Sequence, residues 1–213
     1  MKHISAKDLS PQETLALLTS GVAPRPIALV STISKKGVLN LAPFSFFNAF
    51  GSNPPVVVFS PARRGRNGTT KDTYNNLVET KECVVQVVTH KIVEKVNMTS
   101  AEFPPEVDEF KESGLTPIAS EIVKPPRVKE SPFQMECRLL NMLSIGTGKG
   151  SGNLAICEVL LFHIDEVLYE NGKIHPNKID LVGRNGGDFY TRAQGSALFE
   201  LPKPVLSSPP GLS

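Results

Sequence analysis

A short polar segment, TTKDTYNN at residues 69–76, has the residue types of an anion-binding site at the start of a helix. Threonine hydroxyls, the Lys71 ammonium and unpaired backbone N–H groups would point toward one place, where the helix dipole also favours negative charge. The basic run ARRGR at residues 62–66 could close over the same anion. The arrangement suits a phosphate. Two alternatives stay open: ordinary capping of the helix by Thr70 and Asp72, and a solvated basic loop.

A second segment, NLAPFSFFNAFGSNPP at residues 40–55, combines four phenylalanines with amides and hydroxyls. It contains no acid, base or cysteine, so it lacks the titratable groups of a hydrolytic site. Aromatic rings would bury a planar ligand, and polar groups such as Ser45 and Asn48 would bind its edge. Together with the phosphate segment, this composition suits a flat, conjugated ligand with a phosphate tail, and flavin mononucleotide (FMN) fits that description. Redox chemistry carried by such a cofactor needs no catalytic acid from the protein.

Other motifs that bind nucleotides or metals fail on spacing. The glycine-rich loop GTGKGSG at residues 146–152 lacks the positions of a P-loop and of GxGxxG, so it is interpreted as a hairpin tip. No GxSxG elbow occurs, and no cysteine–histidine pair stands out. No metal site is expected, because the four histidines are dispersed, at His3, His90, His163 and His175.

The composition favours a globular protein whose partners are small molecules or a second copy of itself. Apolar residues make up 40% and charged residues 21%, and the net charge of +2 gives no field for nucleic acid or an anionic membrane. The opening segment MKHISAKDLS is too polar for a signal peptide, and no apolar run reaches the length of a membrane span. Three separated cysteines, Cys83, Cys137 and Cys157, lie in apolar runs and are expected to be buried and free. A cytoplasmic location is therefore expected.

Alternating apolar residues and turn signals predict at least six strands joined mostly by short turns, within residues 24–34, 38–50, 55–60, 82–88, 133–145 and 153–167. Phe46 and Phe47 break the two-residue period of the second strand, so a bulge is expected there. A capping box at Ser10 predicts a short amphipathic helix, with Leu15, Leu17 and Leu18, that ends near Gly21. A second helix is expected over residues 71–80, capped by Thr70. Short turns favour antiparallel pairing, and hence an antiparallel β-barrel with peripheral helices.

The chain also resembles the flavin reductase-like, FMN-binding split-barrel family. The resemblance rests on APRPIALVSTISKKGVLNLAPFSFFNAFGSNPPVVVFSP and KDTYNNLVETKECVVQVV, and continues through VNMTSAEFPPEVDEFKESGLTP, KPPRVKESPFQMECRLL, CEVLLFHIDE and GRNGGDFY. The matching segments occur in the same order over roughly residues 20–192, which is far more specific than any single motif. The loop GTGKGSG departs from the usual residues of the family, and the end of the chain matches nothing recognisable.

The resemblance implies a mainly β fold, a six-stranded antiparallel split β-barrel with peripheral short helices. It implies one domain over residues 1–192, followed by a proline-rich tail over residues 193–213. It also implies a homodimer that binds FMN without a covalent bond near the dimer interface.

Residues that match cofactor-binding positions follow from the same resemblance. They are Ser31, Thr32, Ala42, Pro43, Phe44, Ser45, Asn48, Ser60, Pro61, Lys71, Asp72, Thr73, His163 and Arg184. Among them, Lys71, Asp72 and Thr73 are expected at the phosphate, and His163 and Arg184 at the face that a nicotinamide can reach. Each has a structural alternative: Pro43 and Phe44 could only pack, and Asp72 could only cap its helix.

The implied activity is hydride transfer from NADH or NADPH to flavin, with a monooxygenase as a candidate partner. A flavoredoxin-like electron carrier that binds FMN but does not use nicotinamide is the alternative. A third reading is a split-barrel module with another ligand, such as haem.

Overall fold

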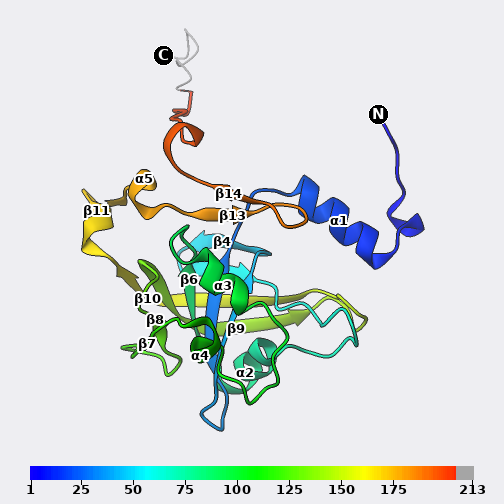
Figure 1. Cartoon of the computed structure of the whole chain (residues 1–213), viewed down its shortest axis with the longest axis horizontal. Helices are drawn as coiled ribbons and strands as arrows, with labels where there is room; N and C mark the ends of the chain where they lie inside the picture. The colour runs from blue at the N-terminus through cyan, green and yellow to red at the C-terminus, as the bar shows by residue number, and fades with distance from the viewer. Residues whose placement is uncertain (205–213) are drawn as a thin grey trace, which may run out of the picture.

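A seven-stranded antiparallel sheet forms the body of the molecule (Figure 1). The structure is a computed structural model, and it describes residues 1–204. The strand order in the sheet is β3-β2-β6-β9-β10-β5-β4. The strands are β2 (Ala28–Ile33), β3 (Leu39–Phe44), β4 (Phe47–Ser52), β5 (Pro55–Phe59), β6 (Glu82–Val87), β9 (Phe133–Ser144) and β10 (Asn153–Ile164).

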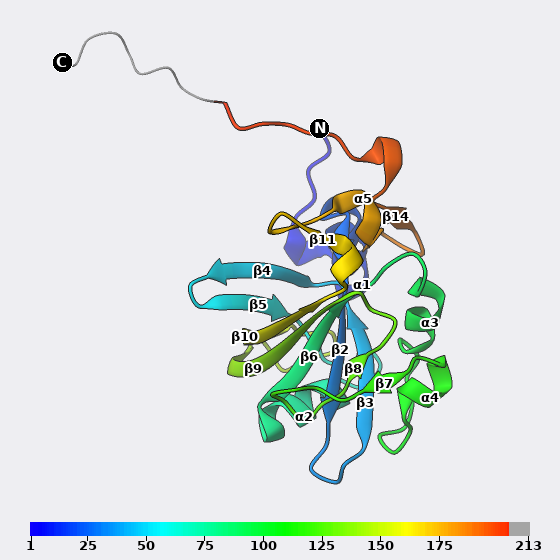
Figure 2. The same ribbon diagram turned by 90° about the vertical axis from the view of Figure 1, so that its left-hand side faces the viewer.

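The two edge strands of this sheet, β3 and β4, are consecutive in the sequence. Only Ser45 and Phe46 separate them, and a chain spans at most about 3.5 Å per residue. The two edges therefore meet at this corner, and Figure 2 shows β3 and β4 leading away from each other beyond it. The sheet curls into a barrel that is split between β3 and β4.

The corner corrects the prediction of one bulged strand over residues 38–50. The structure breaks that segment into two strands, which is why the main sheet has seven strands and not six. Phe44 belongs to the core inside the barrel and Phe47 packs against the same core, so the chain has to turn between them. The register shift of β4 lies further on, between Ala49 and Gly51.

The predicted hairpins are confirmed. β2 pairs with β3 through a tight turn in which the Gly37 N–H donates to the Ser34 carbonyl at 2.9 Å, with Gly37 at φ 82°. β9 and β10, of 12 residues each, form the long hairpin. The glycine-rich loop is its tip, closed by the Ile145 N–H on the Gly152 carbonyl at 3.0 Å.

The helices lie around the sheet, at α1 (Pro11–Gly21), α2 (Asp72–Thr80), α3 (Val93–Met98), α4 (Glu109–Ser113) and α5 (Pro176–Ile179). The capping box of α1 is present, with Ser10 and Glu13 bonded reciprocally. None of the α1 residues is buried, and Leu15, Leu17 and Leu18 are each about half exposed. The apolar residues of α1 therefore contribute nothing to the core of this chain.

Thr70 does not cap α2, contrary to the prediction. Lys71 occupies the cap position and its side chain makes no capping bond. The Thr70 hydroxyl donates instead to the Asn75 side-chain oxygen at 2.7 Å. The start of α2 thus has no side-chain cap, and its first N–H groups stay available.

Two hydrophobic cores stabilise the fold. One fills the barrel interior and contains all three cysteines, which are buried and free as predicted. The other lies between the opposite face of β2 and β3 and the helices α3 and α4, and includes Leu29, Leu41, Val96 and Phe110. It holds α3 and α4 beside the edge strand β3.

Shorter strands complete the fold. β1 (Arg25–Pro26), β13 (Val182–Arg184) and β14 (Tyr190–Arg192) form a three-stranded sheet, in the order β1-β13-β14. Two small hairpins pair β7 (Pro117–Ile118) with β8 (Arg127–Val128) and β11 (Tyr169–Glu170) with β12 (Lys173–Ile174). Over residues 1–204, none of the helices has the length and apolar character that crossing a membrane requires. Of the predicted tail, residues 205–213 lie outside the described residues.

Candidate functional site: a recess and a cleft along strand β3

A small recess of about 80 Å³ lies at the N-terminal end of α2. Lys71 lines it, is half-buried and lies with its ammonium 5.4 Å from the centroid of the Phe44 ring. Within residues 1–204, no carboxylate forms an ion pair with Lys71. Burial, and then the nearby charge of Arg64, lower the pKa of Lys71, against the opposite effect of Glu102. An ammonium without a counter-ion beside an uncapped helix start is a suitable place for an anion.

Arg64 and Asp72 share the wall of the recess as an ion pair of 2.7 Å. The Asp72 carboxylate therefore neutralises Arg64, and it was not found to form a side-chain cap at the start of α2. The other two arginines of the basic loop do not line the recess: Arg63 donates to the carbonyls of Gly68 and Gly146, at 3.0 and 3.3 Å, and Arg66 pairs at 3.0 Å with Glu102 of the recess wall. Of this loop, Arg64 is the arginine that reaches the recess.

A buried polar cluster beneath the recess fixes the start of α2 against the sheet. The side-chain amide of Asn40 donates to the hydroxyls of Thr32 and Thr73, at 3.1 and 3.0 Å. Asn76 donates to the same Thr32 hydroxyl at 3.1 Å. Thr32 and Thr73 were predicted at the cofactor; both belong to this support, and of the two only Thr73 also lines the recess. Both are almost completely buried.

The open edge of β3 forms one wall of the recess. Ala42 and Pro43 line it. The Leu41 N–H, two residues before Pro43, faces outward and donates to the Glu109 carboxylate at 3.0 Å. Pro43 has no N–H to present on the same side. Burial raises the pKa of Glu109, with its bond to Leu41 acting in the opposite direction.

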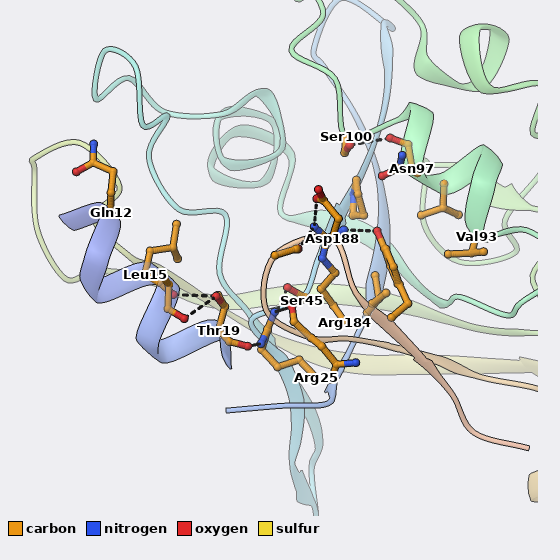
Figure 3. Close-up of a pocket in the computed structure, with 17 residues that line it drawn as sticks. Gln12, Leu15, Thr19, Arg25, Ser45, Val93, Asn97, Ser100, Arg184 and Asp188 are labelled. Carbon is orange, nitrogen blue, oxygen red and sulfur yellow. Dashed lines mark hydrogen bonds and ion pairs between the residues drawn. The ribbon is translucent and has the colours of Figure 1, made fainter. Parts of the chain in front are cut away.

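A larger cleft of about 670 Å³ adjoins the recess, since Pro43 and Ser100 belong to the walls of both (Figure 3). This volume is in the ordinary range of small-molecule sites. The walls come from the α1 helix, the β3 end, the α3 helix and the β13–β14 turn. Apolar residues such as Leu15, Ile27 and Val93 alternate with polar ones, including Ser45. Recess and cleft together form one elongated site along β3.

Arg25 is a buried wall residue of the cleft that the sequence analysis missed. Its guanidinium donates to the carbonyls of Thr19 (2.5 Å), Val22 (2.7 Å) and Asn185 (3.0 Å). Its Nε–H donates to the Ser45 hydroxyl at 3.4 Å. These bonds tie the end of α1 and the β13–β14 turn to the corner after β3.

Arg184, predicted from the resemblance, also lines the cleft. It lies over the Tyr190 ring at 4.5 Å and donates to the Tyr190 hydroxyl and, at 2.7 Å, to the Gly187 carbonyl. Asp188 is 3.6 Å away and fully exposed. Arg184 is thus held in place with part of its guanidinium facing the cleft.

Several of the predicted site residues line neither the recess nor the cleft. Ser31 is buried and donates to the Pro126 carbonyl at 2.5 Å. Ser60 and Pro61 are buried, and the Pro61 carbonyl accepts from the Asn153 side chain at 2.9 Å. These three residues therefore connect parts of the fold and do not line the site.

Asn48 and His163 also lie away from the recess and the cleft. Asn48 is exposed on β4, where its side-chain oxygen accepts from the neighbouring Ala49 N–H at 2.8 Å. The Nε2 atom of His163 lies 2.7 Å from the buried Glu136 carboxylate. Burial acts to raise the pKa of Glu136, but hydrogen bonds from backbone N–H groups and His163 outweigh it and lower the pKa. Within one chain, His163 acts as a structural partner of this carboxylate.

The family model for a flavin reductase like domain matches residues 20–178. The chain belongs to the flavin reductase-like family. An uncharacterized protein of Aquifex aeolicus is 44% identical over 185 residues, which cover 86% of this chain and 92% of that protein.

Solved structures agree with this family membership. Nitrilotriacetate monooxygenase component B from Bacillus cereus is 36% identical, with a TM-score of 0.89 over 94% of this chain and 98% of that one. A flavin reductase with a split barrel domain from Shewanella frigidimarina is 24% identical, with a TM-score of 0.80 over 96% and 100% of the two chains. The second likeness supports only the fold, and the fold is the expected split β-barrel.

The sequence analysis missed three site residues of this flavin reductase-like chain, namely Arg25, Asn40 and Glu109. Arg25 and Asn40 do lie inside the segments that carry the family resemblance, at the starts of PRPIALVST and NLAPFSFF. Their polar side chains within apolar strands were the available signal. Glu109 lies in α4 and accepts a hydrogen bond from the Leu41 N–H, 68 residues away in the sequence, so no local pattern connects Glu109 with Leu41.

Proposed function

We propose that this chain binds FMN in the site along β3 and transfers a hydride from NADH or NADPH to flavin. The observation that carries the proposal is the combination of two adjoining parts: a recess whose ammonium has no carboxylate partner within residues 1–204, and a cleft with mixed apolar and polar walls that shares Pro43 and Ser100 with it. A phosphate suits the recess because charge-assisted bonds from an ammonium and helix N–H groups are strong. A flat ring suits the cleft.

The residues present fit this cofactor. Lys71 and the uncapped N–H groups of α2 would bind the phosphate, and the main chain from Ala42 to Ser45 would run along the ring. Bound FMN would supply the redox chemistry, accepting two electrons from the nicotinamide nucleotide. The protein then has to orient both ligands and keep water out of the cleft. Arg184 lies where it could contact the second ligand.

Family membership supports the activity, and nitrilotriacetate monooxygenase component B supports a role as the reductase component of a monooxygenase. We therefore propose a monooxygenase as the partner that consumes the reduced flavin. Three buried free cysteines support a cytoplasmic location.

Anaerobic mixing of the FMN-loaded protein with NADH or NADPH tests the activity. The long-wavelength absorbance band of the flavin should bleach rapidly with at least one nucleotide. A band that persists with both nucleotides, but bleaches with dithionite, would favour the electron carrier over the reductase. Failure of the purified protein to bind added FMN would exclude both, and a haem titration would then test the third reading.

We also propose a homodimer, on the basis of apolar side chains that residues 1–204 leave exposed. Leu15, Leu17 and Leu18 on α1 are each about half exposed, and Phe50 on the edge strand β4 is 67% exposed. The three leucines lie within one turn of α1, and exposed apolar patches are typical of interfaces. Identical copies most often pair through such patches with twofold symmetry.

Sedimentation of the wild type and of Leu18→Glu tests this proposal. Leu18 does not line the cleft. The wild type should sediment as a dimer and the variant as a monomer, because a carboxylate in an apolar interface is costly. Val167→Glu, at a side chain 71% exposed on a different surface, is the matched control and should stay dimeric. A monomeric wild type would contradict the proposal.

A further inference from the structure

Arg25 is a buried cation without a counter-ion. The residue is 5% exposed, and none of the ion pairs within residues 1–204 includes it. Its donors go to backbone carbonyls and one hydroxyl, none of which carries a formal charge. Charged side chains are almost never buried to this degree unless they are paired.

The carbonyls at the end of α1 offset the charge of Arg25 only in part, and no carboxylate of the described residues pairs with it. Arg184 and Asp188 are the other charged residues of the cleft wall in the described part of the chain. Arg184 adds a second positive charge, and Asp188 is fully exposed to solvent and faces Arg184. By contrast, the buried carboxylate of Glu136 has His163 at 2.7 Å. The cleft wall therefore carries a surplus of positive charge at Arg25.

The position of Arg25 connects this charge to the corner of the split barrel. Its guanidinium lies 5.9 Å from the centroid of the Phe46 ring, and its Nε–H donates to the Ser45 hydroxyl. Because Ser45 accepts this bond, its own hydroxyl proton is free to point into the cleft, which Ser45 also lines. Arg25 thus acts on the cleft by its charge and by the orientation of Ser45 (Figure 3).

We propose that Arg25 is a positioning residue that stabilises the negative charge of reduced flavin in the cleft, through its own charge and through the Ser45 hydroxyl. This inference rests on the proposed function. Reduction adds electrons to the flavin, and a fixed positive charge beside it in a site of low dielectric favours the reduced form. Arg25 therefore raises the reduction potential of bound FMN.

The midpoint potential of bound FMN, measured by equilibration with a redox dye, tests the proposal. Arg25→Gln removes the charge but keeps an amide donor. We expect it to lower the preference for reduced over oxidised FMN about tenfold, or ~30 mV for a two-electron couple. Arg25→Lys keeps the charge and should shift the potential by less than half as much. Arg138→Gln, at a surface arginine paired with Glu158 outside the cleft, is the matched control and should leave the potential unchanged.

Structural damage is separated from the electrostatic effect by a second readout. Both Arg25 variants lose carbonyl contacts, so both should lower the unfolding temperature of the apoprotein, whereas the charge-removing variant should show the larger shift in potential. If Arg25→Gln does not fold, Ser45→Ala decides, since it leaves the carbonyl contacts of Arg25 in place and should lower the potential. An unchanged potential in the deciding variant overturns the inference, as does an equal shift in Arg25→Lys and Arg25→Gln. A wild type that binds no FMN overturns the proposed function itself, and the inference with it.

Discussion

Replacement of Lys71 by methionine should weaken FMN binding and at the same time stabilise the apoprotein. In the apoprotein the ammonium is half-buried, has no carboxylate partner in the described residues and has a lowered pKa caused first by burial. Methionine is apolar and of similar length, so it removes this unfavourable burial of charge. With FMN bound, the same ammonium would have a phosphate as its partner.

The loss of affinity follows from the bond that disappears. A hydrogen bond to a charged group contributes about 1.5–3 kcal/mol, which corresponds to roughly 10- to 150-fold in Kd. Quenching of flavin fluorescence on titration gives Kd for FMN and for riboflavin, which lacks the phosphate. The wild type should bind FMN more tightly than riboflavin, and Lys71→Met should remove most of this difference while leaving the riboflavin affinity nearly unchanged.

Two results would refute the reasoning. An equal loss for FMN and riboflavin would show that Lys71 shapes the site without contacting a phosphate. Unchanged affinity for both would move the phosphate elsewhere, and Arg64 is then the next residue to replace. A rise in apoprotein stability together with the selective loss of FMN cannot result from general unfolding, which makes the pair of measurements specific.

Three further outcomes are expected. Burial raises the pKa of Glu109, so its proton is bound more tightly in the folded state. The unfolding free energy should therefore fall as pH rises from about 4.5 through that raised pKa. In chemical denaturation at a series of pH values, Glu109→Gln should lack this part of the pH dependence. A difference between the two proteins that does not depend on pH would contradict the assignment. Asn40→Ala should cost about 1–3 kcal/mol in unfolding free energy, since it leaves the buried Thr73 hydroxyl without its amide donor and removes one of the two donors to Thr32, while Asn141→Ala, at an exposed position of β9, should cost little. The thiols of Cys83, Cys137 and Cys157 are fully buried, and hydrogen bonds with the other two thiols, followed by burial, raise the pKa of Cys83 well above its usual value. A thiol reagent should therefore label none in the native protein and three after unfolding, and fast native labelling would show that the barrel interior opens.

Local patterns in the sequence predicted the elements that depend on neighbouring residues. The hairpins follow from alternating apolar residues around short turns, and the capping box of α1 follows from Ser10 and Glu13, which are three residues apart. The expected bulge at Phe46 and Phe47 was wrong in form, because the period break marks a corner between two strands. A break in the two-residue apolar alternation shows that the side chains change faces there. Only the packing of Phe44 and Phe47 against one core shows that the change is a corner and not a bulge.

The residues of the site that the sequence analysis missed are those whose partners are distant in the sequence. Glu109 accepts from Leu41, and Arg25 donates to Asn185 across 160 positions. The residue pattern at the start of α2 predicted Lys71, whereas only the resemblance supplied Arg184, and it gave no reason for its placement. Burial and the absence of a counter-ion supply that reason, and both are properties of the folded chain only.

The split of the barrel explains why a ligand, and not another strand, is expected along β3. An exposed edge strand usually invites pairing with a further strand. Here the outward N–H of Leu41 is occupied by Glu109, and Pro43 has none to offer, so the middle of the β3 edge cannot continue a regular ladder. Ser45, the next residue on that side, lies where the chain turns away toward β4. Because Pro43 and the bond from Leu41 to Glu109 keep another strand away, space remains beside the edge. The helices α3 and α4 and the β13–β14 turn enclose that space as the recess and the cleft. Edge protection and ligand binding therefore depend on the same residues of β3.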